Sequence, residues 1–295
     1  MPSNTLSGIN LSSIADQTLE KLSSRFFILN RFARDFSTDI RDRGASVKTR
    51  IPGSVSAVNL NNGYTAQNSS TTEKVITLSN YQGYVVGLKD KEVSLAKSYE
   101  FIERILIGPA IEATVKKLCD DLLALVTAAN FPSAITVSSS NFDADNLADA
   151  ASTLSTNKVG KSLRSALIGY DYESTLMKDV LISNASSYAS PEPIQDHTVR
   201  SVHGIGVTGY EGIPSNGENL EGIICHPSAL IIAARTPALP IGPRVEAVNR
   251  VTEHGLPIQF RRSYDRNNGL HKLSVGVLYG ISTGVSNSLI RLKSS

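Results

Sequence analysis

Residues 45–51, Ala-Ser-Val-Lys-Thr-Arg-Ile, alternate polar side chains with apolar or β-branched ones, and a second alternating run covers residues 73–78. A period of two is the pattern of a β-strand that has one face against a surface. The connection from Pro52 to Thr72 contains no charged residue and is rich in Ser, Asn, Thr and Gly. Connections longer than about 15 residues are unusual inside compact domains. We therefore predict a long hairpin over residues 45–78 that extends across a neighbouring molecule.

The residues before this hairpin are predicted to form an arm with one helix, and not a domain of their own. Apolar side chains such as Leu11, Ile14, Leu22 and Leu29 recur at an approximate helical period. A lone helix of this length is only marginally stable in water. We therefore expect the arm to lie against another part of the chain or against a neighbouring copy.

The longest helical pattern follows the hairpin, from about Ser98 to Asn130. One apolar stripe runs along it at three- and four-residue steps, and opposite charges stand four residues apart on the other face. Pro109 lies inside the pattern and predicts a kink or the start of a new helix, because proline removes a backbone hydrogen bond. The dipeptide Phe131-Pro132 predicts the end of the helix.

The rest of the chain alternates short helices and strands, which together with the hairpin indicates the α+β class. No internal repeat or low-complexity linker divides it into independent domains. The predicted elements are helices at 145–155 and 173–183, strands at 165–169 and 222–225, an apolar run at 229–234, and closing strands at 245–251, 258–264 and 270–278 with a turn at 265–269.

The composition favours a folded protein that works in contact with other molecules. Hydrophobic residues make up 41% of the chain, enough for a real core, whereas charged residues make up only 19%. The formal net charge of +2 is too small to indicate nucleic-acid binding. Basic residues outnumber acidic ones from Arg25 to Arg50, which fits either a solvated, ion-paired face or a surface that touches phosphates.

The two cysteines, Cys119 and Cys225, have neither a CxxC nor a Cys/His ligand spacing, so both are predicted to be buried free thiols. The N-terminus lacks the pattern of a secretion signal, and no apolar run approaches the ~18 residues that span a membrane. We expect synthesis and assembly in a reducing cytoplasm.

Two short motifs are typical of enzymes, but each lacks the sequence context that it needs. Residues 204–209, Gly-Ile-Gly-Val-Thr-Gly, match the dinucleotide motif GxGxxG, yet turn sequence follows in place of the helix that receives phosphate. Residues 280–284, Gly-Ile-Ser-Thr-Gly, match the nucleophile elbow GxSxG, yet no Asp, Glu or His remains downstream. We predict a glycine-rich turn at residues 204–209, a strand in the eleven residues after Gly284, and no catalytic residue.

The histidines are scattered and form no HExxH or other close ligand set, so no metal site and no cofactor are predicted. The acidic pair Asp120 and Asp121 is interpreted as part of the solvated face of the long helix. The five histidines are His197, His203, His226, His254 and His271.

The order of these elements resembles that of tailed-bacteriophage major capsid proteins with the Hong Kong 97-like fold, over nearly the whole chain. Residues 47–52, Val-Lys-Thr-Arg-Ile-Pro, resemble the strand that enters that family's E-loop. Residues 107–121 resemble its long spine helix. Residues 223–230, Ile-Ile-Cys-His-Pro-Ser-Ala-Leu, resemble the strand and following apolar helix of coat subunits.

The resemblance implies a shell subunit that binds copies of itself around a double-stranded DNA genome, in an icosahedral or prolate head, and that is not an enzyme. It implies an α+β fold whose parts are an N-terminal arm at 1–44, an extended E-loop hairpin at 45–80, a peripheral domain with a spine helix and a β-sheet at 81–135 and 245–282, and an axial domain at 136–244 and 283–295.

The implied partners are further copies of the chain, as pentamers and hexamers, a separate scaffolding protein and a portal. The inner surface is implied to contact packaged DNA non-specifically. No membrane is implied, and the implied location is the virion. No Lys lies between Pro52 and Thr72, so we expect no crosslink through the loop tip. The alternatives are an encapsulin-like nanocompartment shell, another virion structural protein and an α+β enzyme.

The residues expected at contacts between subunits lie in the arm and the hairpin. The arm is expected to pack against a neighbour's spine helix, and deletion of residues 54–70 is expected to leave folded but unassembled subunits. The expected contact residues are Phe26, Phe27, Phe32, Arg41, Arg43, Lys48, Arg50, Tyr64 and Glu73.

Overall fold

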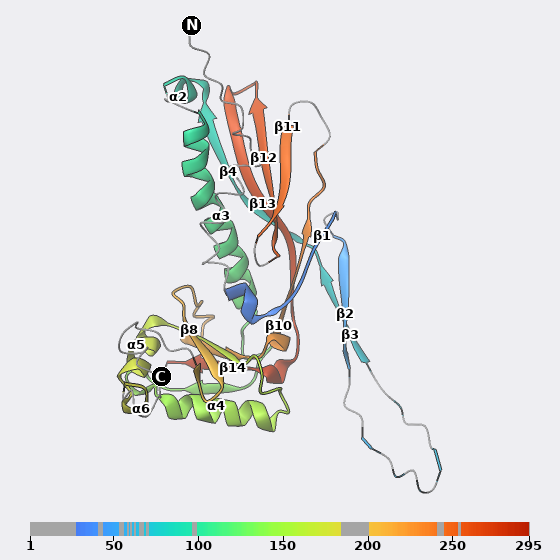
Figure 1. The fold of residues 1–295 in the computed structure, drawn as a ribbon, viewed down its shortest axis with the longest axis vertical. Helices are drawn as coiled ribbons and strands as arrows, with labels where there is room; N and C mark the ends of the chain where they lie inside the picture. The colour runs from blue at the N-terminus through green and yellow to red at the C-terminus, as the bar shows by residue number, and fades with distance from the viewer. Residues whose placement is uncertain are drawn as a thin grey trace.

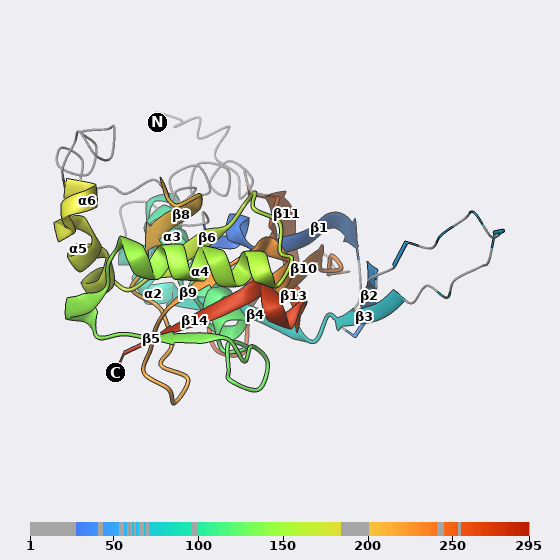
Figure 2. The same ribbon diagram turned by 90° about the horizontal axis from the view of Figure 1, so that it is seen from below.

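The computed structural model shows an elongated body made of two parts stacked along its long axis, with a hairpin that extends away from it (Figures 1 and 2). The predicted N-terminal helix lies outside the described residues, except for a short helical turn over residues 28–31. The structure describes residues 28–40, 44–52, 56–57, 59, 61, 63–64, 68, 71–95, 99–183, 201–240, 245–252 and 255–294.

The larger part, which we call the sheet half, is a six-stranded sheet with a long helix packed along it (Figure 1). Of the strands predicted to close the chain, 258–264 and 270–278 pair in antiparallel register across the turn at residues 265–269, and 245–251 forms the end of the sheet. In spatial order the strands are β1 (Ala33–Ile40), β10 (Leu230–Thr236), β13 (Leu270–Thr283), β12 (Pro257–Asp265) and β11 (Val245–Val251), with β4 (Asn80–Lys89) on the other edge of β13.

The long helix is α3 (Tyr99–Leu123), which follows the short helix α2 (Asp90–Leu95). It continues through Pro109 as one helix, so no second helix begins there. Its buried residues from Ile107 to Leu123 pack against the sheet in one hydrophobic core. The helix ends at Leu123, before the predicted Asn130, at the point where the Asn216 side chain from another loop binds the carbonyl groups of Leu123 and Val126.

The smaller part, which we call the small half, is a second six-stranded sheet covered by helices (Figure 1). One face packs on α4 (Ala144–Thr156) and α5 (Tyr170–Lys178) around a second core, in which Phe142 stacks on Tyr172 with ring centroids 4.7 Å apart. The strands in order are β5 (Ala134–Thr136), β14 (Leu289–Lys293), β9 (Leu220–Cys225), β6 (Ser165–Ile168), β8 (Ile205–Gly209) and β7 (Ser201–Val202).

Two predicted helices differ in the structure. Residues 223–230, which resemble a strand followed by an apolar helix, form the end of β9, a short turn and the first residue of strand β10, and the apolar run 229–234 continues into that strand. A short apolar run does not distinguish a buried helix from a central strand, and here β1 and β13 on either side provide the strand partners. The helix predicted at 173–183 is split at Asp179, whose carboxylate accepts hydrogen bonds from the backbone of Ala144 and Leu181.

Candidate interaction surfaces

The predicted hairpin is present as strands β2 (Ser46–Pro52) and β3 (Thr71–Thr77). Their register is antiparallel, from the pair Ser46 and Thr77 to the pair Pro52 and Thr71. At its root, Ile76 and Leu78 are buried against Ala233 and Leu278 of the large sheet. The hairpin is therefore fixed to the body at one end and extends freely from there (Figure 2).

Beyond this root the described side chains of the hairpin are largely open to solvent. Val75 is 49% exposed, and Tyr64, in the connection between the strands, is 91% exposed. An isolated two-stranded hairpin is only marginally stable in water. A ribbon of this length with exposed apolar side chains is therefore a surface suited to packing on another molecule.

Three of the residues predicted at contacts lie together on this ribbon. The Lys48 Nζ atom is 2.8 Å from the Glu73 carboxylate, which raises the pKa of Lys48, and Arg50 stands opposite Glu73 in the register. The three residues leave one positive charge on this face. Exposed ion pairs contribute little stability by themselves, so this charge pattern bears on partner choice and not on the fold.

The other predicted contact residues divide into two groups. Phe32 is 3% exposed and lies in the core beneath α3, so it packs inside its own chain and offers no surface to a neighbour. Phe26, Phe27, Arg41 and Arg43 lie outside the described residues.

Two further exposed apolar groups were not predicted from the sequence. On β4, Tyr84 and Val85 are 51% and 61% exposed. On the short helix α6 (Val180–Ser183), Val180 and Leu181 are 74% and 52% exposed. An alternation of apolar and polar residues would have marked β4, but its run of Tyr, Val and Gly has none.

The two enzyme-like motifs lie mostly in strands, so the prediction of a glycine-rich turn over residues 204–209 was wrong. Residues 204–209 form β8 and the turn before it, where His203 and Gly204 both have positive φ. Residues 280–283 complete β13, and Gly284 begins the segment that leads from β13 to β14. Neither segment leads into an α-helix, so neither has the geometry that binds phosphate or exposes a nucleophile.

Among the described residues, no group of His, Cys, Asp and Glu is arranged to hold a metal ion. None of the described helices is long and apolar enough to cross a membrane.

Both cysteines are buried free thiols, as predicted. Burial raises the pKa of Cys119 to about 12, with Asp120 adding to the shift, and raises that of Cys225 to about 11. Because only the thiolate reacts readily, we expect no reaction of the native protein with a water-soluble aromatic disulfide at pH 8, and reaction of both thiols in denaturant. Absorbance of the released thiolate measures this; one fast equivalent from the native protein would contradict it.

Comparison with known proteins relates this arrangement to solved structures only, because no protein-family model and no curated protein matches the chain. The capsid structure of the cyanophage P-SCSP1u aligns with a TM-score of 0.62 and 13% identity, covering 90% of this chain and 86% of that one. The mature capsid of bacteriophage PhiM1 aligns with a TM-score of 0.60 and 9% identity, over 90% and 86%. The capsid of an empty GTA particle aligns with a TM-score of 0.54 and 11% identity, over 100% and 94%. At these identities the likeness shows a shared fold.

Proposed function

We propose, from its Hong Kong 97-like capsid fold, that this chain is the major capsid protein of a tailed phage, a subunit that assembles with copies of itself into the head shell. The observation that carries the proposal is the match over nine tenths or more of the chain to subunits of the three capsids named above. Fold alone does not establish function. The exposed ribbon supports the proposal independently, because its shape suits a contact between molecules.

We assign the parts of the chain by this fold. Residues 1–44 are the N-terminal arm and residues 45–80 the E-loop. The peripheral domain consists of 81–135 and 245–282 and the axial domain of 136–244 and 283–295, with β10 counted in the peripheral domain because it pairs with β1 and β13.

The E-loop laps over an adjacent subunit in this proposal. A shell subunit needs many weak contacts whose sum is large, and it spreads them over arm, loop and domain edges. Lys48, Arg50, Tyr64 and Glu73 are the described residues that we retain at this contact. Phe26, Phe27, Arg41 and Arg43 are retained as contacts of the arm, and Phe32 is withdrawn because it is buried in its own core.

The further partners follow from the same proposal. The subunits form pentamers and hexamers, a separate scaffolding protein guides their assembly, a portal occupies one vertex, and the inner surface touches packaged DNA without reading its sequence. Binding to DNA of this kind depends on phosphate neutralisation and weakens with salt.

The test is electron microscopy of the purified protein, expressed alone and together with the genes that flank its own. We expect closed shells of uniform diameter in at least one of the two preparations. Shells that package protein cargo in place of DNA in their native host would indicate a nanocompartment. Monodisperse monomers in both preparations would reject the proposal.

A further inference from the structure

The two halves of the chain share a core, but in the described part of the chain only a few backbone segments cross from one half to the other. Leu167, Ile223 and Leu289 of the small sheet lie in the same hydrophobic cluster as the C-terminal part of α3. Apolar contacts of this kind are non-directional. They hold the halves together, and the directional hydrogen bonds of the segments that cross from one half to the other add to the restraint on the angle between them.

Two of these crossings lie side by side and are bonded to each other. The first, from β9 to β10, contains the turn η4 (Pro227–Ala229), and the second, from β13 to β14, contains η5 (Ser286–Ser288). Backbone hydrogen bonds join them: Gly284 donates to Ala229 at 2.7 Å, Val285 to Ser228 at 2.9 Å, and His226 to Ser288 at 2.9 Å. These hydrogen bonds join the two crossings into one line of attachment between the halves, which we call the paired crossing.

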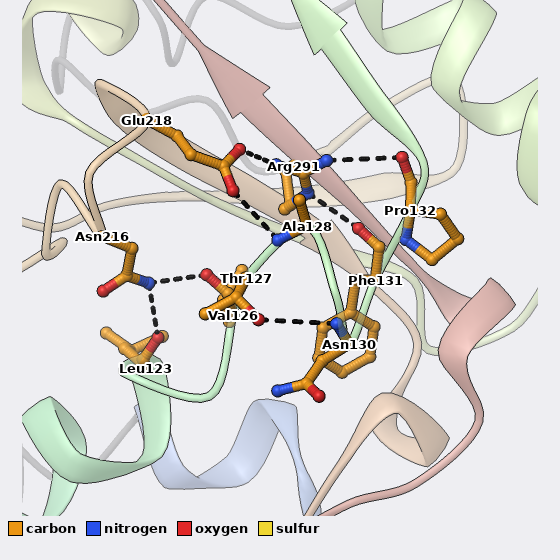
Figure 3. A network of polar contacts seen from close by, with 10 residues as sticks. All are labelled: Leu123, Val126, Thr127, Ala128, Asn130, Phe131, Pro132, Asn216, Glu218 and Arg291. Carbon is orange, nitrogen blue, oxygen red and sulfur yellow. Dashed lines mark hydrogen bonds and ion pairs between the residues drawn. The ribbon is translucent and has the colours of Figure 1, made fainter.

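The third crossing, residues 124–133 between α3 and β5, is held by a loop of the small half (Figure 3). The Asn216 side-chain amide donates to the carbonyl oxygens of Leu123 and Val126, at 3.1 and 2.6 Å. The Leu123 carbonyl also accepts from the Val126 backbone at 3.0 Å, so Asn216 adds a second hydrogen bond there and a further one in the following turn. Asn216 therefore ties the end of α3 to the small half.

Glu218, two residues further on, binds the same crossing directly through one carboxylate oxygen and indirectly through Arg291, with which the other oxygen pairs (Figure 3). Its Oε1 accepts a hydrogen bond from the Ala128 backbone at 2.9 Å, and its Oε2 forms an ion pair with Arg291 of β14. Arg291 Nη1 meets that carboxylate by charge and proximity, without an aligned hydrogen bond. The remaining donors of Arg291 bind the carbonyl oxygens of Phe131, at 2.7 Å, and Pro132, at 3.3 Å.

The loop that carries Asn216 and Glu218 has one tightly defined conformation. Asn216, Gly217 and Asn219 all have positive φ, and the Ser215 carbonyl accepts from the backbone of both Glu218 and Leu220. Asn and Gly are the residues that adopt positive φ most readily. The loop therefore presents its two binding side chains in a fixed orientation.

From this geometry we propose that residues 215–219 act as a clasp that sets the angle between the two halves, and through it the curvature of the shell. The inference rests on the proposed function. In a closed shell, copies of the same subunit form pentamers and hexamers, which differ in curvature. The angle between the two halves of the subunit therefore decides which of these rings form. The paired crossing supplies the line about which the halves turn. The clasp fixes the angle about this line by directional hydrogen bonds to the backbone of the third crossing. Glu218 and Arg291 are positioning residues in this device.

The first test measures the angle in soluble subunits, before assembly. Spin labels are placed at Ala113→Cys on α3 and Ser152→Cys on α4, both exposed positions, and the native thiols are buried. Glu218→Gln keeps the shape of the side chain and an oxygen for Ala128 but removes the ion pair. We expect a broader label-to-label distance distribution in Glu218→Gln than in the chain with Glu218 intact.

The matched control is Asp35→Asn, which removes the Asp35 carboxylate from buried Arg235, a 2.9 Å ion pair inside the sheet half. This variant loses a comparable pair without touching the clasp, so its distance distribution should stay narrow. Equal distributions in the two variants would overturn the proposal.

The second test measures shell size by electron microscopy for the same variants. We expect Glu218→Gln to lower the share of shells with the normal diameter and to add smaller, larger or open forms, whereas Asp35→Asn keeps a single diameter. Normal shells from Glu218→Gln would overturn the inference and leave the capsid function intact. Monodisperse monomers of the unmodified chain in both preparations would reject the capsid function, and the spin-label result would still decide the clasp.

Discussion

A chain in which residues 54–70 are replaced by one glycine is expected to fold and to form no shells. Gly53 and the new glycine then provide a two-residue turn of the kind that closes antiparallel hairpins. The root of the hairpin keeps its buried residues Ile76 and Leu78, so the body loses none of its core. The distal loop, which the proposed function places on a neighbouring subunit, is gone.

Three measurements check this result: circular dichroism for secondary structure, thermal unfolding for stability and gradient sedimentation for assembly. The control replaces residues 54–70 by a Gly/Ser segment of the same length. If that control assembles, the loop acts as a spacer; if it does not, its side chains make the contact. Shells of normal size and yield from the shortened chain would exclude any role of the loop in assembly.

Gly284→Ala is expected to have the largest effect of any single substitution considered for this chain. A Cβ atom at this position would lie 2.0 Å from the Ser228 carbonyl oxygen, at the paired crossing between the halves. That oxygen accepts the hydrogen bond from Val285, so the backbone cannot move away without breaking it. Overpacking of this kind costs about 1–3 kcal/mol, which lowers the unfolding midpoint by several degrees.

Gly87→Ala is the matched control, because a Cβ atom there meets only the end of the Leu270 side chain, at 3.7 Å. We expect its midpoint to be unchanged or slightly raised, since alanine restricts the unfolded chain more than glycine does. Urea or thermal unfolding of the two variants compares them directly. Equal stability of Gly284→Ala and the unsubstituted chain would contradict the close approach at the crossing.

Local patterns in the sequence predicted the elements whose own residues specify them. The alternation at 45–51 and 73–78 became β2 and β3, and the period of the long helix became α3. The α+β class and the Hong Kong 97-like capsid fold were predicted from the order of the elements, and the structural matches confirm them. The burial of Cys119 and Cys225 was also correct.

Elements that depend on distant partners were missed or misread. Strand β1 was predicted as part of an arm, because its parallel partner β10 lies some 200 residues away in the chain. The position of Phe32 shows the same limit, since the sequence marks it as apolar but does not tell its own core from a neighbour's surface.

The sequence by itself determined where strands and helices could form, because side-chain periodicity acts over neighbouring residues. Only the tertiary structure decided where α3 ends and which charges are buried. Asn216, more than ninety residues beyond Leu123, binds the carbonyl group of the last helical residue, and Glu218 meets Arg291 only where β9 pairs with β14 in the small sheet. A directional bond between distant residues requires the chain to bring them together, and no local pattern encodes that meeting.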